Sequence, residues 1–275
     1  MTRSLKALQL KAKHQVYTLL SGNNLSKLYG EGYDFAELRE YQIGDDIRKI
    51  NWTISAKLGK PYIKELHSNR ELSIVVATLM DGSVYFGKEN KKQNKITEIA
   101  SILGYATQQN SDLFTGISFT PEKIFSSPPT KHIYHIEQFS TALFEASLLH
   151  TKLNYQQSIQ TLFQRVHKPS LLFVISDFLE AIDLSLLSQK HDVIAIIVRD
   201  EKEEFPSKQD EVVLKNPTNH AELNTYFSKK NIKNYQMQLK IHDEKQKEHF
   251  ARYDIRFIKV LTQEEPIEKL LHLFR

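Results

Sequence analysis

The chain has 275 residues, with 37 lysines and arginines against 33 aspartates and glutamates, and therefore a formal net charge of +4. This length predicts one large domain, or one domain with a smaller extension, whose core needs no covalent staple. Because the sequence contains no cysteine, it excludes a disulfide scaffold, a thiol nucleophile, an iron–sulfur cluster and a cysteine-ligated zinc site.

Residues 1–22 interleave basic residues with leucines, a pattern that predicts an amphipathic helix. We expect this helix to pack on the rest of the chain, and a helix lying on a membrane surface is the alternative. The segment lacks the unbroken apolar core of a secretory signal, and the longest apolar runs of the chain are strand-sized. The sequence therefore predicts a cytoplasmic protein with no integral membrane segment.

From residue 71 onward, apolar strand patterns alternate with helical ones. Strands are expected at 71–81, 112–120, 123–128, 170–177, 192–200 and 254–262, and helices at 91–110, 132–150, 154–167 and 264–275. A loop at 199–210 precedes a long charged amphipathic stretch at 219–253. This alternation indicates an α/β domain with a doubly wound, mostly parallel sheet and helices on both faces. We assign it to residues 71–275, and residues 1–70 to an N-terminal helix with a small segment after it.

Three of the expected strands end at an aspartate, namely Asp81, Asp177 and Asp200. Parallel strands would bring these carboxylates to one edge of the sheet, where doubly wound domains bind their ligands. Ser83 follows Asp81 in the same turn, and carboxylate and hydroxyl oxygens suit a hard cation such as Mg²⁺. The alternative is that the aspartates only start turns and cap helices.

The turn after residue 81 also has a second interpretation, as a phosphate-binding loop. Residues 82–88, from Gly82 to Lys88, have the spacing Gly-x₄-Gly-Lys after a strand. Glu89, however, stands where Ser or Thr should ligate magnesium, and its carboxylate would repel phosphates. A divergent nucleotide-binding protein that uses this loop is therefore the alternative function.

Other functional classes have less support in the sequence. Neither Gly-x-Ser-x-Gly nor His-Glu-x-x-His occurs, the motifs of common serine hydrolases and zinc proteases. Residues 229–252 are rich in lysine, but acidic side chains interrupt them, so we expect a solvated helix face and no nucleic-acid partner. No catalytic residue is predicted, and we expect the protein not to be an enzyme.

The N-terminal part holds a dense group of charged and aromatic residues around the single tryptophan. The residues that we predict to bind a partner are Arg39, Tyr41, Asp45, Asp46, Arg48 and Trp52. Opposite charges beside aromatic side chains are typical of a recognition surface. A structural network that docks this segment on the α/β domain is the alternative.

Residues 33–66 resemble the signature of a bacterial family, the domain of unknown function numbered fifty-eight. The matching motifs are Phe35, Leu38-Arg39-Glu40-Tyr41, Gly44-Asp45-Asp46, Arg48-Lys49-Ile50, Trp52 and Ser55-Ala56. The resemblance continues through the expected strands and covers nearly the whole chain. The sequence is therefore similar to this family throughout, most specifically in the signature.

The resemblance implies a von Willebrand factor A-like domain, and a role beside MoxR-type AAA+ ATPases in assembling or maturing other proteins. It also implies a metal-ion-dependent adhesion site, with Mg²⁺ held by Asp81, Ser83 and Asp177. That site is degenerate, because Tyr85 replaces a ligand hydroxyl and residues 153–155 read Leu-Asn-Tyr where Thr-Asp-Leu is usual. We therefore expect a non-enzymatic interaction module whose strand-end edge meets a partner, with a MoxR-type ATPase and a client protein as partners.

Overall fold

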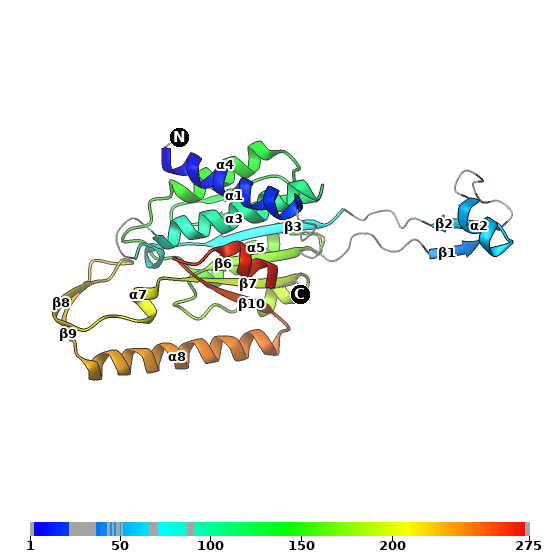
Figure 1. The fold of residues 1–275 in the computed structure, drawn as a ribbon. Helices are drawn as coiled ribbons and strands as arrows, with labels where there is room; N and C mark the ends of the chain where they lie inside the picture. Colours follow the sequence, from blue (N-terminus) through cyan, green and yellow to red (C-terminus); the bar gives the residue numbers. More distant parts are fainter. Residues whose placement is uncertain are drawn as a thin grey trace.

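The computed structural model describes residues 3–21, 37–42, 45, 47, 50, 52–65, 71–86 and 91–272. Its centre is a six-stranded sheet in the order β10-β7-β6-β3-β4-β5 (Figure 1). The strands are β3 (Ser73–Leu79), β4 (Leu113–Phe119), β5 (Ile124–Ser126), β6 (Leu171–Ser176), β7 (Asp192–Arg199) and β10 (Arg256–Leu261). Neighbouring strands are parallel, except that β5 runs antiparallel to β4.

Helices cover both faces of this sheet (Figure 1). Along β3, Ile74 and Val76 pack into one hydrophobic cluster, and Val75 and Ala77 pack into the other. The first cluster lies under α1 (Arg3–Ser21), α3 (Lys91–Gln109), α4 (Ile133–Phe144) and α9 (Pro266–His272), and the second under α5 (Tyr155–Arg165), α6 (Ser185–Ser188) and α8 (Lys229–Arg252). A strand buried on both faces reads as a continuous apolar run. The predicted doubly wound α/β domain is confirmed.

The strand order places a topological switch point between β3 and β6. Numbered along the chain within the sheet, the strands follow the doubly wound order 3-2-1-4-5-6. The chain leaves β3 toward one edge of the sheet and returns at β6 to build the other half. Ligands of such sheets bind beyond the carboxyl ends of the strands at this point.

Helix α1 packs against α3 and α4 through its apolar face. Leu5, Ala12 and Val16 are fully buried there, whereas Leu10 on the opposite side is 59% exposed. The helix therefore belongs to the main core, although the predicted boundary at residue 70 groups it with the N-terminal segment. None of the helices in the described ranges combines the length and the apolar composition needed to cross a membrane.

The region between β7 and α8 differs from the expectation of a loop and one long amphipathic stretch. The chain forms a short helix α7 (Glu201–Glu204) and then an antiparallel hairpin of β8 (Gln209–Lys215) and β9 (Glu222–Phe227). In Figure 1 this hairpin lies beside one end of the sheet, the same end at which α8 begins. Because its strands are mostly exposed on both faces, they carry no apolar alternation from which to predict them.

The family-like signature forms a second, smaller sheet. Strand β1 (Glu37–Glu40) pairs antiparallel with β2 (Tyr62–Glu65), and α2 (Trp52–Leu58) lies between them in sequence. The hydroxyl of Ser55 accepts a hydrogen bond of 2.8 Å from the backbone N–H of Tyr62. This bond ties the helix to the start of β2.

Candidate functional site

Asp81 and Asp177 lie at the carboxyl edge of the sheet, one after β3 and the other after β6. The two strands are parallel neighbours, and the hydroxyl of Ser176 donates a 2.9 Å hydrogen bond to the carbonyl of Leu79 where they end. The structure therefore brings both predicted carboxylates to the switch point. Each side chain is only 1% exposed.

The carboxylate of Asp81 accepts hydrogen bonds at both oxygens. Oδ1 accepts from the N–H of Ser83 at 2.8 Å, and Oδ2 accepts from the N–H of Leu153 at 3.1 Å and the hydroxyl of Tyr155 at 3.2 Å. Burial and the charges of Asp177 and Asp81 raise the pKa of Tyr155, so its phenol remains a donor. Asp81 thus joins the turn after β3 to the start of α5.

The cation that faces Asp177 is the side chain of Lys92, from the first turn of α3. Its Nζ lies 3.0 Å from Oδ2 of Asp177 and 2.7 Å from Oε1 of Glu203 in α7. The three side chains are 0%, 1% and 7% exposed, respectively. The ring of Phe86 lies 5.6 Å from the same nitrogen. One buried ammonium therefore binds two buried acids.

The charges around Lys92 shift the pKa values of both acids. Burial by itself would raise the pKa of Asp177, but Lys92, the Ser83 hydroxyl and Arg199 together hold it below its ordinary value. Ser83 contributes although its buried hydroxyl makes no hydrogen bond of good geometry with the described residues. Burial raises the pKa of Glu203, and Lys92 offsets this only in part. Asp177 is therefore the carboxylate that the local charges hold ionised.

This arrangement does not fit the Mg²⁺ site expected at Asp81, Ser83 and Asp177. Mg²⁺ binds oxygen ligands at about 2.0–2.1 Å in octahedral geometry and keeps several waters. Asp177 instead contacts the Lys92 ammonium, and both oxygens of Asp81 accept protein hydrogen bonds. Within the described ranges, no group of three or more His, Cys, Asp or Glu side chains is placed to hold a metal. Mg²⁺ binding stays a prediction from the sequence.

The tip of the β8–β9 hairpin covers the turn after β3. A Cβ added to Gly82 would lie 2.0 Å from the carbonyl oxygen of Pro217, so the hairpin backbone touches this turn directly. The same carbonyl accepts a 2.8 Å hydrogen bond from the N–H of His150, whose ring lies 4.0 Å from that of His220. A ligand approaching Gly82 from solvent would have to displace the hairpin.

This contact also bears on the predicted phosphate loop. Residues 82–84 form a short 3₁₀ turn, η2 (Gly82–Val84), packed against Pro217. That packing leaves no room for a phosphate beside Gly82. Lys88 lies outside the described residues.

Asp200, the third strand-end aspartate, caps α7. Its Oδ1 accepts from the N–H of Lys202 at 3.0 Å, and its Oδ2 accepts from the hydroxyl of Thr262 at 2.7 Å. Its own N–H donates to Glu203, which completes a capping box. The capping interpretation therefore describes Asp200, and the box fixes Glu203 where Lys92 reaches it.

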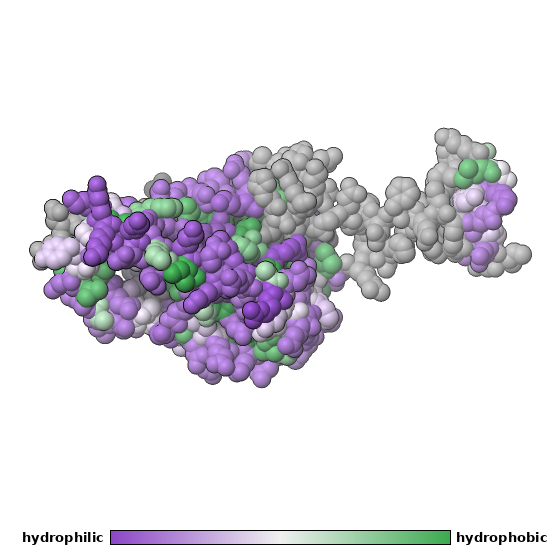
Figure 2. All heavy atoms as spheres, turned by 90° about the horizontal axis from the view of Figure 1, so that it is seen from below, coloured by the Kyte–Doolittle hydropathy of each residue, from purple (hydrophilic) through white to green (hydrophobic). Residues whose placement is uncertain are grey.

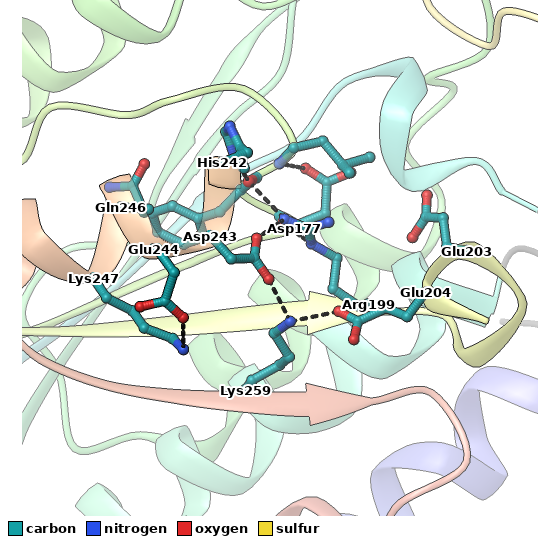
Figure 3. A network of polar contacts seen from close by, with 12 residues as sticks. Asp177, Arg199, Glu203, Glu204, His242, Asp243, Glu244, Gln246, Lys247 and Lys259 are labelled. Carbon is teal, nitrogen blue, oxygen red and sulfur yellow. Dashed lines mark hydrogen bonds and ion pairs between the residues drawn. The ribbon is translucent and has the colours of Figure 1, made fainter. Parts of the chain in front are cut away.

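Arg199 holds the backbone that follows Asp177 (Figure 3). The buried guanidinium donates from Nε to the carbonyl of Asp177, and from Nη2 to the carbonyl of Phe178 at 2.8 Å. Phe178 has a left-handed φ of 49°, unusual for a bulky residue. Asp243 of α8 lies 3.3 Å from Nη2 and 2.7 Å from Nζ of Lys259. This network holds the backbone directly after β6 against α8.

Four of the predicted partner-binding residues are described, in β1, in the segment after it and at the start of α2. Tyr41 donates its N–H to the carbonyl of Pro61 at 2.8 Å, and Asp45 accepts from the N–H of Gln42 at 2.8 Å. Trp52, at the start of α2, is 66% exposed. Asp46 and Arg48 lie outside the described residues, and of Arg39 only the backbone, in β1, is described.

Lys92, Glu203 and Arg199 are functional residues of this site that the sequence did not predict. Lys92 stands four residues before Ile96 on the apolar stripe of α3, so a cation at an inward-facing helical position was the available signal. Asp200 and Glu203 have the spacing of a capping box. Arg199 ends a continuous apolar strand, where a buried charge needs partners.

Known proteins with similar sequences or structures show which family this chain belongs to. It is 25% identical over 221 residues to the uncharacterized proteins Rv1480 of Mycobacterium tuberculosis and Mb1516 of Mycobacterium bovis, with 76% of this chain and 69% of theirs covered. The solved structure of the conserved hypothetical protein BatB from Bacteroides thetaiotaomicron is 9% identical, with a TM-score of 0.40 over 74% of this chain and 96% of that one. An aerotolerance-related membrane protein from Bacteroides fragilis is 12% identical, with a TM-score of 0.39 over 69% and 91%. The model of the family DUF58, described as a protein of unknown function, matches residues 37–246, and the chain belongs to this family.

Proposed function

We propose that this chain is a non-enzymatic interaction module that works in the cytoplasm with a MoxR-type AAA+ ATPase in assembling or maturing a client protein. Membership of DUF58 supports this proposal through the signature motifs that the chain carries. The role of the ATPase comes from the resemblance of the sequence to that family. The observation that carries the proposal is an exposed apolar surface beside the covered switch point.

This surface comprises both faces of the β8–β9 hairpin and the first half of α8: Leu214 lies opposite Leu223 on one face of the hairpin, and Val213 lies on the other. Its members are large apolar side chains that are 40–61% exposed: Val213, Leu214, Leu223, Tyr226 and Met237. Figure 2 views the molecule from the side of α8, where small apolar groups interrupt a largely hydrophilic face. Aromatic residues and methionine are enriched in protein interfaces. We therefore assign partner binding to this hairpin surface.

In this proposal, the partner contacts the hairpin that covers the strand-end edge of the sheet, and not the edge itself. Asp81 and Asp177 are too deeply buried for a partner carboxylate to reach them while Pro217 lies on Gly82. The exposed indole of Trp52 supplies a second contact in this proposal.

Binding to the purified MoxR-type ATPase of the source organism tests the proposal. With immobilised full-length chain, we expect saturable binding that Tyr226→Ser and Leu223→Ser each weaken by roughly 10- to 100-fold. Tyr134→Ser on α4 is the matched control, because Tyr134 is 63% exposed against 61% for Tyr226. An ATPase that fails to bind the wild type in its ATP, ADP and empty states contradicts the proposal.

A further inference from the structure

The geometry points to Lys92 as a built-in replacement for a divalent cation at the switch point. In this inference, the Lys92 ammonium occupies the position that Mg²⁺ would take beside Asp177, and the edge of the sheet is assembled without metal. The inference concerns the interior of the site and does not rest on the proposed partner.

The charge balance around Lys92 is the first argument. Asp177 and Glu203 approach each other from β6 and α7, and both are almost completely buried. Two carboxylates without a cation would be costly in such a place, because buried charges require pairing. The ammonium lies within 3.0 Å of both. It supplies the positive charge that the two acids require.

Lys92 and Mg²⁺ would compete for the same carboxylate oxygen of Asp177. A Mg²⁺ ion bound to Oδ2 of Asp177 would stand about 2.0–2.1 Å from that oxygen. The Lys92 nitrogen already lies 3.0 Å from the same oxygen, with no exposed surface. A second cation on this buried oxygen would be repelled strongly by the Lys92 ammonium, because water is excluded there, so Mg²⁺ binding is disfavoured while Lys92 stays in place. Lys92 and Mg²⁺ are therefore alternatives at Asp177.

The remaining predicted ligands give the third argument. Both carboxylate oxygens of Asp81 accept hydrogen bonds, from Ser83, Leu153 and Tyr155. A metal that bound Asp81 would have to displace at least one of these donors. The Ser83 hydroxyl is buried and makes no hydrogen bond of good geometry with the described residues. It is therefore not committed to a protein donor or acceptor among the described residues.

Removal of Lys92 tests the inference in the full-length chain. After treatment with EDTA, thermal unfolding is followed during titration with MgCl₂ and MnCl₂. We expect no shift for the wild type. Lys92→Ala should have a lower Tm in EDTA and a saturable rise with metal, about 5–10 °C at a hundredfold excess over Kd for a domain of this size. The rise should disappear in Lys92→Ala/Asp177→Asn.

Lys95→Ala is the matched control. Lys95 lies one turn later on α3 and pairs with Glu98 at 2.7 Å, at a similarly low exposure. Its removal should lower the Tm without creating a response to metal. A response of Lys95→Ala equal to that of Lys92→Ala would overturn the inference, as would a Lys92→Ala protein that folds and ignores both metals.

A measurement on the wild type covers the case in which Lys92→Ala does not fold. Lys92 should give a slowly exchanging ¹⁵N-ammonium resonance, assigned by its through-space contact with the ring of Phe86, 5.6 Å from the nitrogen, that MgCl₂ leaves unchanged. Saturable displacement of this resonance by MgCl₂, abolished in Asp177→Asn, would show that the metal binds in place of Lys92 and would overturn the inference.

Discussion

Pro217 and Gly82 touch through their backbones, although 135 residues separate them in sequence: a Cβ on Gly82 would meet the carbonyl oxygen of Pro217 at 2.0 Å. This contact seats the hairpin tip on the turn after β3. Because any side chain at position 82 would collide with this carbonyl, the packing requires glycine there. A switch point that the topology leaves open is covered in this protein by the hairpin.

Gly82→Ala should displace the hairpin tip. The added methyl group meets backbone atoms, which cannot rotate away, so we expect a loss of about 1–3 kcal/mol in the free energy of unfolding. Urea denaturation measures this loss. Hydrogen exchange at the His150 amide, bonded to Pro217, should accelerate. The control is the amide of Gly116 in β4, which donates to the hydroxyl of Ser127 just after β5 and should keep its protection.

Leu5→Ala and Leu10→Ala test the assignment of α1 to the main core. Leu5 is fully buried and Leu10 is 59% exposed on the same helix. We expect Leu5→Ala to lower the free energy of unfolding by about 2–5 kcal/mol, as for other buried leucines. Leu10→Ala should change it by no more than about 0.5 kcal/mol. Equal effects in urea titrations would show that α1 does not pack as described.

Arg199→Met should destabilise the exit of β6. The buried guanidinium serves two carbonyls and Asp243, and its removal leaves these acceptors short of a donor. We expect a loss of about 3–5 kcal/mol in the free energy of unfolding, the usual cost of breaking a buried pair. Arg256→Met is the control, because its pair with Asp192 is exposed and should contribute about 1 kcal/mol or less. Chemical denaturation of both variants gives the comparison.

His191 should make stability fall in mild acid. Burial, with a smaller effect of Lys190, lowers its pKa below the ordinary 6.5. The folded protein therefore binds this proton less well than the unfolded chain. The stability that neutral His191 supplies is present above pH 6.5 and is lost as the pH falls through the folded-state value.

The free energy of unfolding at about pH 7.5 and about pH 5 measures this loss. His191→Phe should reduce the difference between the two conditions, whereas His132→Phe at an exposed position should leave it unchanged. A pH dependence that is the same in His191→Phe and in the wild type would contradict the assignment.

Much of the fold could be predicted because its signals are local. The continuous apolar runs of β3, β6 and β7 and the helical stripe of α3 are properties of short segments. The β8–β9 hairpin could not be predicted, because strands with two mostly exposed faces carry no apolar alternation. Its role as a cover over Gly82 depends on a contact with a distant part of the chain.

The sequence predicted where the candidate site lies, but not which side chains surround Asp177. Strand patterns located Asp81 and Asp177 at one edge, because parallel strands share a direction. Whether a metal ion or a side chain neutralises Asp177 depends on what the start of α3 and the start of α7 bring to it. Lys92 and Glu203 are 111 residues apart, and no spacing rule connects them.

The sequence by itself determined the doubly wound α/β class, the family signature and the positions of the strand-end aspartates, because periodicity and motifs are written in consecutive residues. Only the tertiary structure decided that Lys92 faces Asp177, that Arg199 holds the next turn and that Pro217 covers Gly82. These contacts arise when separate helices, strands and loops pack at one edge of the sheet. Burial there makes each charge depend on the partner that packing supplies.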